Sequence, residues 1–137
     1  MAHVVHLEDD VPLQLILKIA FEAAEPTVQL KQFITGDDAL RYSAPHIHDI
    51  DLFILDIRVP GSLDGLQVAQ RLRELGCTAP VMVSSAYGKP QSEFLMRYQC
   101  EWIGKPWYLT ETIKHLLDAV QRRGQSHGPL SAGSPSQ

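Results

Sequence analysis

The sequence predicts an α/β protein built on a doubly wound parallel sheet of five strands, with five helices covering its two faces. Apolar segments and helical patterns alternate five times between residues 3 and 121, and this alternation is typical of parallel sheets with right-handed crossovers. The segments "DLFILDI" (51–57) and "APVMVSS" (79–85) are apolar at consecutive positions, as central strands covered on both faces are.

The first strand and helix are predicted within residues 3–24. "HVVHL" (3–7) is a short β-type segment that ends at a run of acids. Apolar residues then recur at spacings of three and four over 13–24, which indicates an amphipathic helix. Asp10 is a suitable N-cap for this helix, and Pro12 suits its first turn.

The middle of the chain continues the alternation. Residues 27–35, "TVQLKQFIT", alternate apolar and polar as a half-exposed strand does, and residues 37–44 predict a short helix that Pro45 closes. After the third strand, apolar residues over 66–75 predict another helix, which Gly76 stops.

The C-terminal part predicts two more helices around a fifth strand. Residues 90–99 form a weaker helical pattern, "EWIG" (101–104) is a short strand, and apolar positions over 109–120 mark a final amphipathic helix. We therefore expect one domain over residues 1–123. Residues 124–137 are rich in Gly, Ser, Pro and Gln, which is typical of a flexible tail.

Composition argues against several classes of function. The 137 residues carry a formal net charge of −4 without a basic stripe, which argues against a nucleic-acid partner. No apolar run approaches the roughly 18 residues that a membrane-spanning helix needs, and no signal peptide is recognisable. Two cysteines are too few for a disulfide scaffold, so we expect a protein of the reducing cytoplasm.

Polar side chains stand at the ends of four predicted strands, and the carboxyl ends of parallel strands meet at one edge of the sheet, where ligand sites lie. These side chains are Glu8 and Asp9, Asp56, Ser85 and Lys105. Any one acid in such a place is usually a helix cap or a solvated loop residue, and a lone lysine or serine is usually a surface or turn residue. Their coincidence at one edge favours a functional site.

The residue types at this edge suit phosphoryl chemistry. Three crowded carboxylates raise one another's pKa unless a cation lies among them, and oxygen ligands on an open rim favour Mg²⁺ over zinc. The lysine adds a fixed positive charge and the serine adds a hydroxyl donor. An aspartate beside Mg²⁺, a lysine and a hydroxyl has the groups needed to accept a phosphoryl group.

The chain resembles the receiver domain of bacterial two-component response regulators over about residues 3–121. The motifs in register are "VVHLEDD", "FILDIRVPGSLDG", "PVMVSSA" and "WIGKPW". The resemblance implies a flavodoxin-like sheet in the strand order 2-1-3-4-5. Because residues 124–137 are too few for an output domain, we expect a stand-alone, chemotaxis-regulator-like receiver, the alternative being a receiver cut from a longer protein.

The same resemblance implies roles for the residues at the sheet edge. Asp56 would be the phosphorylated residue and also a metal ligand. Asp9 would bind Mg²⁺ directly, Glu8 would act mainly through water, and the backbone carbonyl of Arg58 would be the third protein ligand. Ser85 would bind a phosphoryl oxygen.

Further roles follow for residues around Asp56. Lys105 would pair with Asp56 and then with the phosphoryl group, and the Lys105-Pro106 peptide bond is expected to be cis. Arg58 and Tyr87, each two residues beyond a site residue, would flank the path of the hydrolytic water. Because both side chains are long, we expect slow loss of the phosphoryl group.

The switch implied by the resemblance involves Ser85 and Trp102. Ser85 would move toward the phosphoryl group, and the aromatic ring of the fifth strand would fill the vacated space. Trp102 stands where the family usually has Tyr or Phe, and its larger ring needs more room. The small residues Ala86 and Gly104 could provide that room.

Two further departures from the family pattern carry expectations. The loop "VPGSLDG" after Asp56 holds one extra residue, and we expect it to bulge without moving Asp56, because the strand anchors that residue. His6 replaces an apolar residue in a central strand. We expect it to be a neutral, hydrogen-bonded core histidine.

The implied function is signalling rather than metabolic catalysis. The domain would accept a phosphoryl group from a histidine kinase or a phosphotransfer protein and present a changed surface to a downstream protein. One alternative is a degenerate receiver that binds partners without phosphorylation. Another is a metal-dependent phosphohydrolase, but haloacid-dehalogenase-type enzymes need a second Asp where this chain has Arg58, and a cap insertion is lacking.

The predicted fourth helix, fifth strand and fifth helix would form one face of the domain. Their aromatic and aliphatic residues include Phe94, Leu95, Trp102 and Trp107. An exposed patch of these would indicate a homodimer or partner face, whereas burial in the core is the commoner fate of each.

Overall fold

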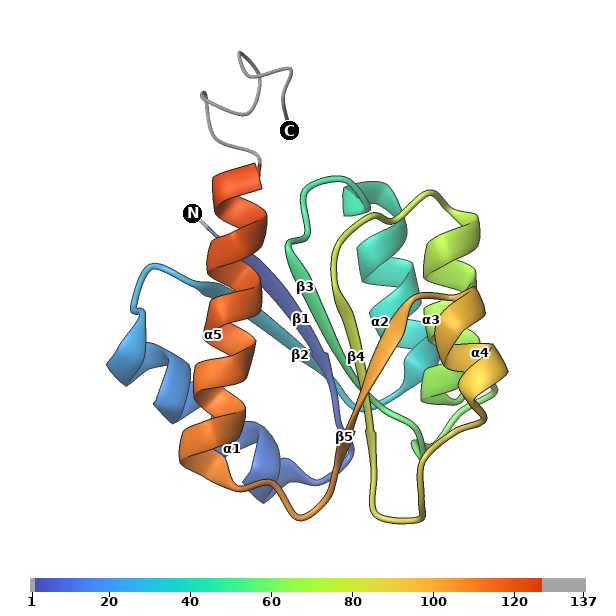
Figure 1. Ribbon diagram of the computed structural model, residues 1–137, viewed down its shortest axis with the longest axis horizontal. Helices are drawn as coiled ribbons and strands as arrows, with labels where there is room; N and C mark the ends of the chain where they lie inside the picture. Colours follow the sequence, from blue (N-terminus) through green and yellow to red (C-terminus); the bar gives the residue numbers. More distant parts are fainter. Residues whose placement is uncertain (1, 127–137) are drawn as a thin grey trace.

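Five parallel strands form the predicted sheet in a computed structural model that describes residues 2–126 (Figure 1). The strands are β1 (His3–Leu7), β2 (Gln29–Phe33), β3 (Leu52–Asp56), β4 (Val81–Ser85) and β5 (Cys100–Gly104). Their order across the sheet is β2-β1-β3-β4-β5, and every neighbouring pair is parallel, which confirms the predicted fold class and strand order.

Helices cover both faces of the sheet. They are α1 (Val11–Ala24), α2 (Gly36–Ser43), α3 (Gly65–Glu74), α4 (Ser92–Arg97) and α5 (Leu109–Ser126), with a 3-10 helix at Ala44–His46 after α2. α1 and α5 lie on one face, whereas α2, α3 and α4 lie on the other (Figure 1). Among the helices of residues 2–126, none is both long enough and apolar enough to cross a bilayer.

The start of α1 has the predicted cap, and the last helix, α5, continues to Ser126. Asp10 caps α1, because its Oδ1 accepts a hydrogen bond from the Leu13 N–H at 3.2 Å. α5 runs on to Ser126, past the expected domain end at residue 123, because one glycine inside a helix costs only about 1 kcal/mol. Residues 127–137, the rest of the predicted tail, lie outside the described part of the chain.

Alternate residues of the strands pack into two cores, one on each face of the sheet. On the side of α2, α3 and α4, the strands contribute Val5, Leu7, Phe53, Leu55, Val81 and Val83. On the side of α1 and α5, they contribute Val4, Leu52, Ile54 and Met82. Consecutive residues at a strand end therefore point to opposite faces of the sheet. This alternation determines on which face each polar side chain of the site lies.

A guanidinium from α3 joins the start of β5 to the segment before β4. Arg73 Nε donates to the Tyr98 carbonyl at 2.7 Å, and its Nη2 donates to the Gln99 carbonyl at 2.9 Å. Its Nη1 donates to the carbonyls of Cys77 and Ala79 at 3.0 and 2.8 Å. These bonds fix the entry of β5 relative to β4, and therefore the register in which both strands reach the site.

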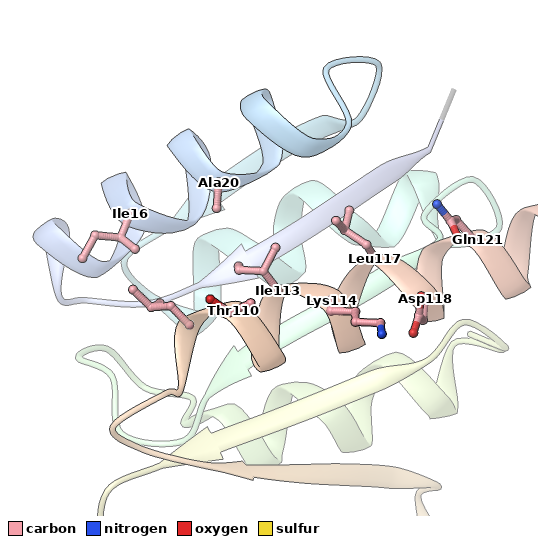
Figure 2. A pocket seen from close by; sticks show the side chains of 9 residues that line it. Ile16, Ala20, Thr110, Ile113, Lys114, Leu117, Asp118 and Gln121 are labelled. Carbon is pink, nitrogen blue, oxygen red and sulfur yellow. The ribbon is translucent and has the colours of Figure 1, made fainter.

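α1 exposes more of its apolar pattern than the sequence predicted. Leu17 and Phe21 are buried, but Ile16 is 41% exposed. Ile16 and Ala20 line a groove between α1 and α5 instead of entering the core, opposite Ile113 of α5 (Figure 2). The helical spacing identified the helix correctly but could not show that α5 covers only part of its apolar stripe.

Of the two alternatives left open for the α4, β5 and α5 face, burial in the core describes these side chains better than an exposed patch does. Leu95 is buried, and Phe94, Trp102 and Trp107 are only partly exposed. Met96 of α4 and Tyr108, which precedes α5, are exposed, whereas the exposed Leu109 lines the groove between α1 and α5. Phe94 packs against Tyr98, the residue that follows α4, with ring centroids 4.8 Å apart.

Candidate functional site

The carboxyl ends of β1 and β3 bring three acids together at one edge of the sheet. Glu8, Asp9 and Asp56 each place a carboxylate oxygen within 4.8 Å of the others. Glu8 and Asp56 are buried, whereas Asp9 is exposed. The predicted convergence of these acids is thus a feature of the structure, and its donor set of oxygens only is the kind that Mg²⁺ binds.

Lys105, which follows β5, reaches into this acidic cluster. Its Nζ lies 2.7 Å from Glu8 Oε1 and 3.4 Å from Asp56 Oδ2. The contact with Asp56 is the pairing that the resemblance implies, and the contact with Glu8 is the shorter of the two. Glu8 is almost fully buried and its charge needs a close partner, and the N–H of Asp10 donates to its second oxygen at 3.2 Å.

The electrostatics of the cluster favour a bound cation. Burial of the Asp56 carboxyl, followed by the hydrogen bond and charge of Glu8, raises the pKa of Asp56 to about 7, although Lys105 acts in the opposite direction. Partial burial disfavours the charged form of Lys105, but bonds and charges from Glu8 and Asp56 outweigh burial and raise its pKa. One ammonium cannot neutralise three carboxylates, so a divalent cation would relieve the remaining repulsion.

Ser85 lies buried at the end of β4 and already has two partners. Its hydroxyl donates to the Gly88 carbonyl at 2.9 Å and accepts a hydrogen bond from Trp102 Nε1 at 3.2 Å. The Trp102 ring lies over Gly104, where a Cβ would come within 2.9 Å of the ring. Gly104 therefore makes room for the indole in this position, and Ala86 is exposed.

Arg58 and Tyr87 form a pair at the rim of the site. Both side chains are exposed, and the Arg58 guanidinium carbon lies 4.3 Å from the centre of the Tyr87 ring. Such stacking of a cation on an aromatic face is attractive. The two residues that were expected to flank the hydrolytic water are therefore in contact with each other, one from the loop after β3 and the other from the loop after β4.

The loop after Asp56 is anchored at both ends. The Gly65 N–H donates to the Ile57 carbonyl at 2.9 Å, which closes the loop beside Asp56. Gly65 packs against the backbone of Asp56 so closely that a Cβ would overlap the Asp56 carbonyl. Asp37 of α2 accepts the N–H of Ser62 at 3.0 Å and also the Ser62 hydroxyl. The extra residue is thus held on the outer part of the loop.

Several hydrogen bonds that support the site were not predicted from the sequence. Gln14 donates to the Glu8 carbonyl at 2.8 Å and to the Phe33 carbonyl at 3.0 Å, and so joins α1 to the ends of β1 and β2. Ser84 accepts a hydrogen bond from Trp107 Nε1 at 2.9 Å. These contacts depend on side chains that meet across elements, and no local motif signals them.

His6 and the Lys105-Pro106 bond agree with the sequence-based expectations. His6 is buried, and its Nδ1 lies 3.1 Å from Gln32 Nε2. Burial, and secondarily the charge of Lys105, lowers the pKa of His6 to about 3, so the ring is neutral at physiological pH. The Lys105-Pro106 peptide bond is cis.

Comparison with known proteins identifies the class to which this fold and this site belong. The family described as "Response regulator receiver domain" matches residues 4–116. The chain therefore belongs to the receiver domain family of response regulators, whose members are signalling domains in phosphoryl-accepting pathways rather than classical enzymes.

Individual relatives agree with this assignment. Response regulator RppA from Synechocystis sp. is 29% identical over 90% of this chain and 52% of its own length. Transcriptional regulatory protein CiaR from Streptococcus pneumoniae is 26% identical over 91% of this chain and 54% of its own length. The chain thus spans about half the length of these curated relatives.

A solved structure agrees in fold. The CheY-like response regulator receiver domain protein from Methanospirillum hungatei JF-1 superposes with a TM-score of 0.77 at 14% identity. The match covers 92% of this chain and 98% of the other. The likeness at this low identity concerns the fold, and it agrees with the observed strand order.

Proposed function

We propose that this receiver accepts a phosphoryl group on Asp56 from a histidine kinase or a histidine phosphotransfer protein. The observation that carries the proposal is the position of the Asp56 carboxylate among Glu8, Asp9 and Lys105. In the transfer, an Asp56 oxygen forms a bond to phosphorus as the bond between phosphorus and the donor histidine nitrogen breaks. The electron pair of the broken bond stays on that nitrogen.

The residues of the cluster fit Mg²⁺. Asp9, Asp56 and the backbone carbonyl of Arg58 would hold the ion, and Glu8 would act through water. Glu8 already gives one oxygen to Lys105 and the other to a backbone N–H, whereas Asp9 is exposed and has no such ties among the described contacts. When bound, Mg²⁺ would neutralise charge on the phosphoryl oxygens.

Lys105 and Ser85 would stabilise the transferred group. The Lys105 ammonium lies within reach of Asp56 and needs only a small shift from Glu8 to contact a phosphoryl oxygen. Ser85 would rotate its hydroxyl so that the proton turns from the Gly88 carbonyl to a phosphoryl oxygen. The Ser85 oxygen would remain free to accept the N–H of Trp102, which would couple the site to β5.

The proposed phosphodonor would approach along α1. This helix begins at Val11, two residues after Asp9, and exposes the aliphatic side chains of Val11, Leu15 and Ile19. Aliphatic surface next to a charged site favours a protein partner over a small metabolite. The downstream protein would bind the face of α4, β5 and α5, and that face could also pair with a second copy of the chain to form a homodimer.

The domain would also promote its own phosphorylation by small phosphodonors and its own slow dephosphorylation. Asp56, Lys105 and Ser85 supply the groups for both reactions. The stacked Arg58 and Tyr87 would restrict the approach of water, which would make the phosphorylated state persist.

Incubation with acetyl phosphate tests the proposal. With Mg²⁺, the intact mass of the protein should rise by one phosphoryl group, and chelation of Mg²⁺ should prevent the rise. Asp56→Asn should show no rise, because the amide keeps the shape of the side chain but not the nucleophile. An unaltered protein that gains no mass would favour a degenerate receiver that acts without phosphorylation.

A further inference from the structure

The end of β4 carries two consecutive serines that bind two indole groups on opposite faces of the sheet. Ser85 accepts the N–H of Trp102 on the side of α3 and α4. Ser84 accepts the N–H of Trp107 on the side of α1 and α5. The first pair belongs to the proposed switch. The second pair lies outside the proposed phosphoryl site.

The Ser84 hydroxyl is a buried junction between β4, β5 and the loop before α5. It accepts the Trp107 N–H at 2.9 Å and donates to the Ile103 carbonyl at 2.7 Å. Ser84 is 1% exposed. If either bond were lost, water could not replace the missing partner, and a buried polar group would be left without a hydrogen bond. The backbone carbonyl of Ser84 also accepts the N–H of Ile57, one residue after Asp56.

These bonds hold Lys105 from both sides along the chain. On the N-terminal side, the Lys105 N–H donates to the Ser85 carbonyl at 3.0 Å. On the C-terminal side, Trp107 is tied to Ser84 through its indole. The Trp107 ring also packs against the neutral ring of His6, with centroids 6.1 Å apart, so the loop is supported by β1 as well.

The Lys105 ammonium lies closer to Glu8 than to Asp56. It is carried on a flexible four-carbon stem, and its Nζ is 3.4 Å from Asp56 Oδ2, already longer than its 2.7 Å contact with Glu8. Because the contact with Asp56 is already the longer of the two, we expect it to be the first that a displacement of the loop would weaken.

We propose that Trp107 is a positioning residue that, through Ser84, holds Lys105 where it can contact a phosphoryl group on Asp56. This inference rests on the proposed function of Asp56. Trp107 itself would not touch the phosphoryl group. Its N–H, rather than its ring alone, is the feature that matters, because the N–H fixes the loop to a buried atom of the sheet.

The test compares Trp107→Phe with the unaltered protein. Phenylalanine keeps an aromatic ring beside His6 and removes the N–H, and Ser84 can still donate to the Ile103 carbonyl. The measured quantity is the Kd of beryllofluoride, a phosphoryl mimic, at saturating Mg²⁺. We expect the Kd to rise roughly tenfold, because a group misplaced by a fraction of an ångström loses much of its contact with the ligand. Tyr108→Phe, a change at an exposed neighbour, is the matched control and should leave the Kd unchanged.

Repeating the comparison in a Lys105→Ala variant distinguishes an effect on the position of Lys105 from a general disturbance of the fold. In Lys105→Ala, which itself weakens binding, Trp107→Phe should have no further effect on the Kd. Ser84→Ala provides a second route to the same loss and should not add to Trp107→Phe. A Trp107→Phe protein with an unchanged Kd, or one that loses as much affinity with Lys105→Ala as without it, would overturn the inference.

Failure of the proposed function gives a different result. If acetyl phosphate does not label Asp56 in the unaltered protein but beryllofluoride binding depends on Trp107, the proposed function fails and the positioning of Lys105 stands. If the unaltered protein is labelled and Trp107→Phe binds the mimic normally, only the inference fails. An unaltered protein that neither binds the mimic nor accepts label would remove both.

Discussion

At the scale of single residues, burying Asp56 and Glu8 side by side lowers the stability of the folded protein. Asp56 has a pKa of about 7, against an ordinary value of 3.8, mainly because burial penalises its charged form. Below pH 3.8, the carboxyl is protonated in the folded and the unfolded chain alike. As the pH rises from about 4 to 7, the unfolded chain loses this proton first, and stability should fall over that window.

Asp56→Asn should therefore stabilise the metal-free protein, and more so at higher pH. An amide cannot ionise, so the pH-dependent cost disappears, and we expect a gain of about 1 to 2 kcal/mol in the free energy of unfolding at pH 8. The gain should shrink toward pH 4, where the carboxyl is neutral in both states. Urea denaturation in the presence of a chelator measures it. A gain that does not vary with pH would mean that another contact of Asp56 causes it.

Arg58 and Tyr87 are expected to control how long the phosphorylated state lasts. Because the two side chains stack over the rim, each holds the other in place, and we expect the double variant Arg58→Ala, Tyr87→Ala to lose its phosphoryl group several times faster than the unaltered protein. Each single variant should show most of this effect. The decay of labelled protein after removal of the donor gives the rate, and a double variant that decays no faster would show that the pair does not restrict water.

At the scale of elements, the alternation of side chains between the two faces of the sheet decides which groups reach the site. β4 presents Ser84 to one face of the sheet and Ser85 to the other. Each serine accepts a hydrogen bond from an indole, Ser85 from Trp102 of β5 and Ser84 from Trp107 of the following loop. The Trp102 N–H donates to the Ser85 hydroxyl at 3.2 Å, so a change at Ser85 reaches β5 through one hydrogen bond.

Trp102 fluorescence should report this coupling. When beryllofluoride and Mg²⁺ saturate the protein, Ser85 exchanges the Gly88 carbonyl for the mimic, and the environment of the indole changes with it. We expect a shift in emission of the unaltered protein that Trp102→Phe largely removes. If the shift persists in Trp102→Phe, Trp107 or a loop movement is its source, and the aromatic switch at Trp102 is wrong.

The sequence predicted the elements well because the two strongest signals are local. The consecutive apolar positions of β3 and β4 and the stripe of α5 identified buried strands and an amphipathic helix, and the strand ends then located Asp56 and Lys105. Local signals could not show that α5 leaves Ile16 in an open groove, that Asp37 holds Ser62, or that Glu8 takes the shorter contact with Lys105. Each of these depends on which side chains meet across elements.

At the scale of the whole molecule, Mg²⁺ should couple the site to global stability. A ligand that binds only the folded state stabilises it by mass action, by about 1.4 kcal/mol at a concentration about ten times its Kd. We expect thermal unfolding to shift upward with added Mg²⁺. Asp9→Asn should reduce the shift more than Glu8→Gln, because Asp9 is exposed to a ligand, whereas Glu8 is committed to Lys105. Equal losses would contradict the distinction between direct binding and binding through water.

The residue that carries the acyl phosphate can be identified directly by chemical reduction. Borohydride reduces an aspartyl phosphate to homoserine and leaves free carboxylates unchanged. After labelling with acetyl phosphate and Mg²⁺, peptide mass spectrometry of the reduced protein should find homoserine at position 56, with Glu8 and Asp9 unmodified. Homoserine at another aspartate, or none in a protein that has gained a phosphoryl mass, would contradict the assignment of Asp56 as the acceptor.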